Sequence, residues 1–258
     1  MKVKSPLSWV GAVCVGLGIM MGMAPAPALA ADSGPVRIAF VGDSMADGLW
    51  GALFRRLGKD KCLGDKITLI RKAKNGTGLT RLDQFNWVAE VGTMAKEGAA
   101  DVFVGSFGIN DRQAIVDASR VRTEFDTPSF DSRYQSFTED LIKNAISNGG
   151  SILIAGLPVM QDSAANSDAK AKNKLFEAAV AAVNSPLATY MKPWSSKAGE
   201  DEYQPFLPNA NNHLVQFRAE DGIHFTRIGY DQVMDYFYPF VMAALKARGR
   251  DVLSECSK

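Results

Sequence analysis

Short apolar segments rich in β-branched residues alternate along this chain with longer segments, and this alternation restricts the folds that the chain can adopt. Each apolar segment is long enough for one buried strand, and most of the intervening segments are long enough for a helix. Buried strands that alternate with helices form a parallel sheet with helices on both faces, so the sequence predicts an α/β fold with about five strands. The strands are predicted at residues 36–41, 67–70, 101–107, 151–157 and 213–217. The helices are predicted at residues 46–57, 84–96, 131–148, 168–192 and 226–247.

The N-terminal region has the residue order of a secretory signal peptide. Lys2 and Lys4 precede an apolar stretch at residues 7–23, and alanines and prolines follow it. This order predicts cleavage after Ala30, which leaves residues 31–258 as a single domain. A retained membrane anchor is the alternative, but the alanine and proline run resembles a cleavage region more than the flank of a membrane span. We therefore expect a periplasmic or secreted protein with no stable membrane insertion after cleavage.

The composition gives no support to several other classes of protein. The formal net charge is +1 and the charged residues of both signs are mixed along the chain, so there is no basic patch for nucleic acid. No CxxC, HExxH or similar cluster of metal ligands occurs. Cys62 and Cys256 are the only cysteines after the predicted signal peptide. An oxidising compartment would permit them to form a disulfide, and the sequence leaves open whether they pair or remain separate thiols.

Ser44 stands between the first predicted strand and the first predicted helix, within Val41-Gly42-Asp43-Ser44-Met45. This position places its hydroxyl at the carboxyl edge of a parallel sheet, where open α/β folds bind their ligands. The helix N-terminus adds backbone donors and a dipole that favours negative charge. Taken alone, Ser44 is more simply interpreted as the cap of that helix.

A potential base for this serine lies near the other end of the chain. The sequence has two histidines, and His224 follows Asp221 by three residues. Asp221 can hold the imidazole in one tautomer while the other ring nitrogen accepts the serine proton. Separately, His224 is interpreted as structural and Asp221 as a helix cap, but together with Ser44 they predict a catalytic triad. His213 has no comparable partner and is predicted to be structural.

Two further segments end at the same predicted edge of the sheet. The side-chain amide of Asn110 could point at a developing oxyanion, and a backbone N–H of Gly76 or Gly78 could point at the same place. One such donor stabilises a transition state by about 3 kcal/mol. The alternative for both segments is ordinary turn chemistry, because glycine and asparagine are common turn residues.

Four blocks in this order resemble the SGNH, or GDSL-like, hydrolase superfamily. The blocks are Gly42-Asp43-Ser44, Gly76 to Gly78, Gly108-Ile109-Asn110-Asp111 and Asp221-Gly222-Ile223-His224. The resemblance spans nearly all of the chain after the predicted signal peptide. It implies a three-layer, flavodoxin-like fold and catalysis without a metal or other cofactor.

The resemblance also implies a role for each matching residue. Ser44 would be the nucleophile, His224 the general base and Asp221 its orienting partner. The oxyanion hole would use the backbone N–H of Ser44, the side chain of Asn110 and a glycine of the second block, for which we choose Gly78 over Gly76. Methionine and alanine follow Ser44 where many members of the superfamily have leucine soon after the serine, and the second block is short. These departures resemble a divergent cell-envelope branch.

These assignments predict an exported serine esterase that hydrolyses O-acyl esters, above all O-acetyl esters on envelope or extracellular polysaccharide, through an acyl-Ser44 intermediate. Arg112 and Gln113 follow the third block and are predicted to contact a polar or anionic group of the substrate. A polysaccharide O-acyltransferase and a lipid esterase or lysophospholipase remain alternatives, as does a glycan-binding assembly module without turnover. The natural acyl group, the oligomeric state and any protein partners are undetermined by the sequence.

Overall fold

The structure is a computed structural model that describes residues 1, 34–194, 202–209 and 211–257. The predicted signal peptide, apart from Met1, lies outside the described residues, so cleavage after Ala30 stays a prediction. Among the helices of the described ranges, none has both the length and the apolar character that a membrane crossing requires.

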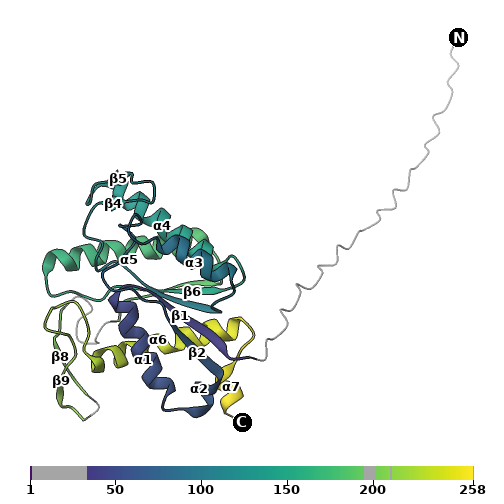
Figure 1. Cartoon of the computed structure of the whole chain (residues 1–258), viewed down its shortest axis with the longest axis vertical. Coiled ribbons are helices and arrows are strands. Elements are labelled where there is room, and N and C mark those ends of the chain that lie inside the picture. Colours follow the sequence, from purple (N-terminus) through teal and green to yellow (C-terminus); the bar gives the residue numbers. More distant parts are fainter. Residues whose placement is uncertain (2–33, 195–201, 210, 258) are drawn as a thin grey trace. The chain divides into compact units, whose positions relative to one another are not determined.

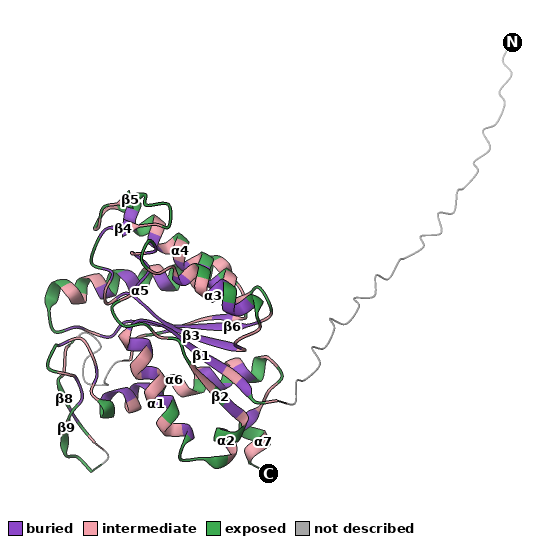
Figure 2. Cartoon of the chain, viewed as in Figure 1, coloured by how far each residue is buried: buried purple, intermediate pink, exposed green. Residues whose placement is uncertain are grey.

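A five-stranded parallel sheet in the order β2-β1-β3-β6-β7 forms the middle layer (Figure 1). Its strands are β1 (Val36–Gly42), β2 (Ile67–Arg71), β3 (Val102–Ser106), β6 (Ser151–Ala155) and β7 (Ala188–Met191). The strands β1, β3 and β6 are buried almost throughout, as expected for a parallel sheet that is covered on both faces (Figure 2).

Helices form the two outer layers (Figure 1). One face of the sheet carries α3 (Trp87–Lys96), α4 (Pro128–Ile146) and α5 (Ser163–Val183). The other face carries α1 (Ser44–Leu57) and α6 (Arg227–Ala247), together with the short helices α2 (Lys61–Lys66) and α7 (Val252–Cys256). Two small antiparallel hairpins, β4 (Ile115–Val116) with β5 (Arg122–Thr123) and β8 (Phe206–Pro208) with β9 (Leu214–Gln216), lie outside the main sheet. The predicted three-layer α/β fold is confirmed.

The fifth strand of the sheet differs from the prediction. The sequence predicts residues 213–217 there, but they contribute β9 to the hairpin, and β7 takes the place beside β6. The predicted helix over 168–192 is confirmed as far as Val183 and wrong beyond it, because α5 ends there and residues 188–191 form β7. Asn184 adopts a left-handed backbone conformation with φ 47° and caps the helix, and Pro186 then disfavours helical backbone at the residue before it.

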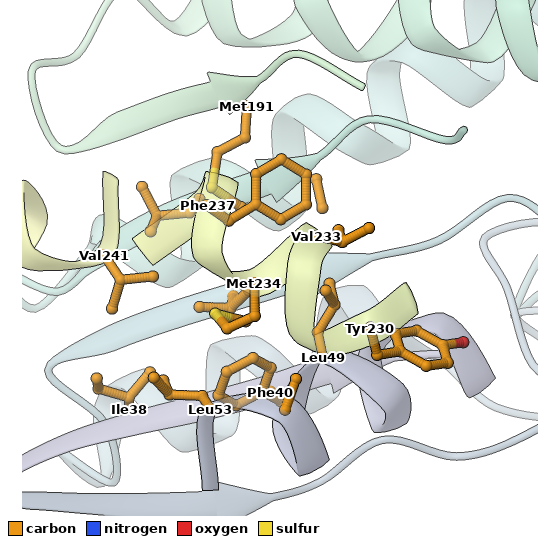
Figure 3. Packing of buried hydrophobic residues seen from close by; sticks show 14 of the residues in the cluster. Ile38, Phe40, Leu49, Leu53, Met191, Tyr230, Val233, Met234, Phe237 and Val241 are labelled. Carbon is orange, nitrogen blue, oxygen red and sulfur yellow. The ribbon is translucent and has the colours of Figure 1, made fainter. Parts of the chain in front are cut away.

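The core on the α1 and α6 side holds these two helices against the sheet. Figure 3 shows Phe40 of β1 and Leu49 of α1 close to side chains of α6, among them Met234. All three are at most 3% exposed, and burial of each contributes about 1.5–3 kcal/mol. The two helices approach so closely that a Cβ atom at Gly48 would lie 2.0 Å from the ring of Tyr230. The start of α1 and the start of α6 are therefore fixed relative to each other.

A disulfide joins Cys62 of α2 to Cys256 of α7, with their Cα atoms 5.7 Å apart and 194 positions between them in sequence. Of the two possibilities that the sequence left open, the structure has the paired cysteines.

Candidate active site

Ser44 is the first residue of α1, directly after a tight turn at the end of β1. The turn passes so close to β3 that a Cβ atom at Gly42, where φ is 125°, would lie 1.8 Å from the carbonyl oxygen of Ser106. Only glycine fits there. Asp43 is the helix cap, because its side chain accepts a hydrogen bond of 2.9 Å from the backbone N–H of Met45. The alternative in which Ser44 is the cap is therefore wrong, and its hydroxyl is available for another partner.

That partner is His224. The Ser44 Oγ lies 2.7 Å from His224 Nε2, although the residues are 180 positions apart. On the other side of the ring, His224 Nδ1 lies 2.6 Å from Asp221 Oδ2. The structure thus brings the three predicted residues together in one continuous hydrogen-bonded chain, with the order that a serine, a base and an orienting carboxylate require.

Asp221 also organises the loop that carries the histidine. Its Oδ1 accepts hydrogen bonds of 2.9 Å from the backbone N–H groups of Ile223 and His224. Desolvation alone would raise the pKa of Asp221, but the hydrogen bonds from the His224 ring and from these two N–H groups outweigh it and lower the pKa to about 2. The carboxylate is therefore ionised at neutral pH and can hold Nδ1 of the ring in its protonated form.

The third block contacts the second block on both sides of Gly78. Asn110 Nδ2 donates to the carbonyl oxygen of Thr77 at 2.9 Å. The buried carboxylate of Asp111 accepts from the backbone N–H groups of Leu79 and Thr80, at 3.0 and 3.2 Å, and from the Thr80 hydroxyl at 2.7 Å. These contacts hold the glycine loop against the turn that carries Asn110.

The two glycines of the second block have different surroundings. A Cβ atom at Gly78 would lie 2.0 Å from Asp111 Oδ1, whereas a Cβ atom at Gly76 would meet nothing within 4 Å. The loop is therefore pressed against the third block at Gly78, the glycine that we chose for the oxyanion hole. The catalytic role itself stays a prediction.

Asp43 is a buried acid that the sequence indicated only as part of a motif. Its side chain is fully buried, and its Oδ2 has no hydrogen-bond partner among the described residues. Burial, reinforced by the charge of Asp111, raises the pKa of Asp43 to about 8. At neutral pH most of this carboxyl is therefore protonated, directly beside Ser44 in sequence.

The remaining predicted residues lie at the margin of this site. Gln113 Nε2 donates to the backbone carbonyl of Asn110 at 2.8 Å, so it supports the third block. Arg112 is 3.6 Å from Asp162 in an exposed ion pair, and a role of either residue in substrate binding stays a prediction. His213 is exposed, and its backbone N–H donates to Asn209 Oδ1 at 3.0 Å. Across the described ranges, no group of three or more His, Cys, Asp or Glu side chains is placed to hold a metal ion.

Solved structures with the same fold are esterases and a related hydrolase. A carbohydrate esterase of family 3 from Talaromyces cellulolyticus is 12% identical, with a TM-score of 0.55 over 82% of this chain and 99% of that chain. The aryl esterase of M. smegmatis is 14% identical, with a TM-score of 0.51 over 81% of this chain and 100% of that chain. An α/β hydrolase from the metagenome of Lake Arreo, Spain, is 14% identical, with a TM-score of 0.51 over 84% and 97% of the two chains.

A comparison with curated protein sequences found no match. The family model described as "Protein of unknown function (DUF459)" matches residues 37–239, from β1 to the middle of α6. Because this match covers most of the chain, the protein belongs to the DUF459 family, and it has the fold of the SGNH, or GDSL-like, esterases.

Proposed function

We propose that this protein is a serine hydrolase of carboxylic esters, with Ser44 as nucleophile, His224 as general base and Asp221 as the residue that orients the base. The observation that carries the proposal is the chain of hydrogen bonds from Ser44 Oγ through both ring nitrogens of His224 to Asp221, at 2.7 and 2.6 Å. A serine hydroxyl is a weak nucleophile unless a base removes its proton as it attacks. The esterases of the same fold support the same class of reaction.

The geometry supports a double-displacement reaction. Ser44 Oγ attacks the carbonyl carbon of the ester while its proton moves to His224 Nε2. The tetrahedral intermediate then collapses, and His224 gives the proton to the departing alcohol, which leaves an acyl-Ser44. Water attacks this acyl group, His224 takes a proton from the water, and the acid leaves as the proton returns to Ser44 Oγ. Asp221 stabilises the imidazolium that forms in each half of the reaction.

The developing oxyanion would be bound by the backbone N–H groups of Ser44 and Gly78 and by Asn110. Asn110 Nδ2 carries two N–H bonds, and its hydrogen bond to Thr77 uses one of them. The second N–H can point at the substrate while the first fixes the direction of the amide. This arrangement meets the need of an oxyanion hole for donors that are already oriented before the charge develops.

The substrate we propose is an O-acyl ester, above all an O-acetyl ester, on an envelope or extracellular polysaccharide. The side chains of His224 and Asp221 are 30% and 47% exposed, so the base lies where an ester on a large polymer can reach it. Export is supported by the residue order of the first thirty positions, and the Cys62–Cys256 disulfide suits an oxidising compartment. One of the esterases of the same fold is named a carbohydrate esterase.

The test uses p-nitrophenyl acetate and an O-acetylated polysaccharide with the wild-type protein and its Ser44→Ala variant. We expect acid release by the wild type, an acetyl adduct in its intact mass, and loss of both in Ser44→Ala, with kcat lower by at least about 10³-fold. Ser132→Ala, on the exposed surface of α4, is the matched control and should behave as the wild type. If the folded Ser44→Ala variant turns over the ester as fast as the wild type, the mechanism is refuted. An acetylated glycan formed in place of free acetate would instead identify a transferase.

A further inference from the structure

Arg218 is a buried cation next to the loop that carries the proposed base. It is 4% exposed and follows β9 by two positions. Its guanidinium donates to three backbone carbonyls: Nη2 to Ile223 at 2.6 Å, Nε to His224 at 3.3 Å, and Nη1 to Val159 at 2.6 Å. Two of these carbonyls belong to His224 and to the residue before it, and the third belongs to the segment that follows β6. The side chain therefore ties the histidine loop to the carboxyl edge of the sheet.

Two aromatic rings also lie close to the guanidinium. Its central carbon lies 4.5 Å from the centre of the Phe225 ring and 4.9 Å from the centre of the Tyr203 ring. A cation near the face of an aromatic ring is attracted by the ring, and a planar guanidinium packs well against it, so these contacts help to hold the side chain in place. Burial lowers the pKa of Arg218 to about 10, with Tyr203, Tyr230 and Asp221 opposing this decrease. The side chain thus remains charged at neutral pH.

Backbone hydrogen bonds also hold the histidine loop. The backbone N–H of Ala219 donates to the His224 carbonyl at 2.9 Å, and the backbone N–H of Gln161 donates to the Gly222 carbonyl at 3.0 Å. The hydrogen bonds that the Asp221 carboxylate accepts stay within the loop itself. Arg218 adds a side-chain connection from the loop at Ile223 and His224 to Val159, which is 59 positions away from Arg218 in sequence.

We propose that Arg218 is a positioning residue for the ester hydrolysis: its three-carbonyl contact sets the backbone of His224 so that Nε2 faces Ser44. The inference rests on the proposed function, because it assigns Arg218 to the same site. A shift of about 1 Å in a reacting group lowers the rate of an enzyme by about 10²-fold, so a residue that acts only through the position of His224 should affect kcat more than KM. Lysine has the charge but lacks the planar fork that reaches three acceptors at once.

Kinetics of Arg218→Ala and Arg218→Lys test this inference with p-nitrophenyl acetate. We expect Arg218→Ala to lower kcat by about 10- to 100-fold with little change in KM, and added guanidinium ion to restore part of the loss. Arg218→Lys should also lose kcat, and it carries the test if the alanine variant fails to fold. Arg250→Ala is the matched control. The Arg250 side chain, near the C-terminus of the chain, is also largely buried, and it donates to the backbone carbonyl of Gly34 at 2.8 Å. It should lose stability but keep its kcat.

A second measurement separates this inference from the proposed function. The proton between His224 Nδ1 and Asp221 Oδ2 should give a downfield NMR signal, which Asp221→Asn should abolish. We expect this signal to shift or broaden in both Arg218 variants and to stay unchanged in Arg250→Ala. An unchanged signal together with a wild-type kcat in a folded Arg218 variant would overturn the positioning role. Turnover that survives Ser44→Ala would overturn the proposed function instead, while the NMR comparison would still decide whether Arg218 positions His224.

Discussion

The Tyr134 hydroxyl donates a hydrogen bond of 2.8 Å to Oδ2 of the buried Asp111, the last residue of the third block. Burial and the charge of Asp111 raise the pKa of the Tyr134 hydroxyl well above its ordinary value, so it stays protonated and serves as a donor. Asp111 accepts its other hydrogen bonds from Leu79 and Thr80, which directly follow the second block. The tyrosine therefore supports, from α4, the carboxylate that joins the two blocks.

Tyr134→Phe should lower the free energy of unfolding by about 1–3 kcal/mol, because a buried carboxylate loses one of its donors without a replacement. We expect a smaller effect on kcat, since the hydrogen bonds that Leu79 and Thr80 donate to Asp111 remain. Urea unfolding measures the first quantity and ester hydrolysis the second. Tyr236→Phe, on the exposed side of α6, is the control and should leave both unchanged. A Tyr134→Phe variant as stable as the wild type would show that this hydrogen bond contributes nothing net.

Asn110→Ala should lower kcat by about 10²- to 10³-fold with little effect on KM, because it removes a donor that acts on the charge developing in the transition state. Steady-state kinetics with an activated acetyl ester measures both constants. Asn144→Ala is closely matched, since Asn144 Nδ2 also donates to a backbone carbonyl, that of Val88, at 2.9 Å, but near the C-terminal end of α4. Equal loss of kcat in the two variants would place the effect of Asn110 in folding and not in an oxyanion hole.

The sequence predicted the parts of this molecule whose signals are local. Each strand that precedes a catalytic block is a short apolar run, and parallel strands bring their carboxyl ends to one edge, so the order of the blocks alone predicts that Ser44 and Asn110 share that edge. His224 was identifiable because an aspartate three positions away supplies its partner. These inferences needed only spacing and residue type.

The parts that the sequence did not predict depend on distant contacts or on competing local signals. The strand β7 follows a long helical pattern, and the end of that helix at Asn184 depends on one left-handed residue. Residues 214–216 have an apolar character that suits the main sheet, but they pair with 206–208 instead. In the sequence, Arg218 looks like an ordinary loop arginine, and its hydrogen bond to the carbonyl of Val159, 59 positions away, could not be predicted from local signals.

Asp43→Asn should change the pH dependence of stability. The folded protein retains the Asp43 proton up to a pKa of about 8, while the ordinary value is 3.8. Between these values the folded state binds more protons than the unfolded state, so the contribution of this group is complete below pH 3.8 and declines as the pH rises, by about 1.4 kcal/mol per pH unit. Asparagine is neutral throughout and keeps an oxygen for the Met45 N–H. Its free energy of unfolding should therefore fall less than that of the wild type from pH 5 to pH 7.

Urea unfolding at several pH values measures this difference. Asp60→Asn is the control, because Asp60 also caps a helix, α2, but is exposed. The control should show the pH dependence of the wild type. Parallel curves of the free energy of unfolding against pH for Asp43→Asn and the wild type would contradict this prediction. They would mean that Asp43 is ionised in the folded protein and places a negative charge next to Ser44.

Loss of the disulfide should affect stability and spare catalysis. Cys62 and Cys256 close a loop with a separation of 194 residues, for which the entropy of the unfolded chain gives an upper value of about 5 kcal/mol. The helix α2 follows the far end of α1, whose 14 residues extend roughly 20 Å from Ser44. The double variant Cys62→Ser/Cys256→Ser should thus unfold at a lower urea concentration than the wild type, with a free energy of unfolding lower by about 2–5 kcal/mol. It should keep the kcat of the wild type under conditions where it is folded.

Reduction of the wild type should reproduce this loss of stability, and the reductant should have no effect on the double variant. A folded double variant with much lower kcat would show that the disulfide supports the catalytic edge through α1, because α1 connects α2 with Ser44.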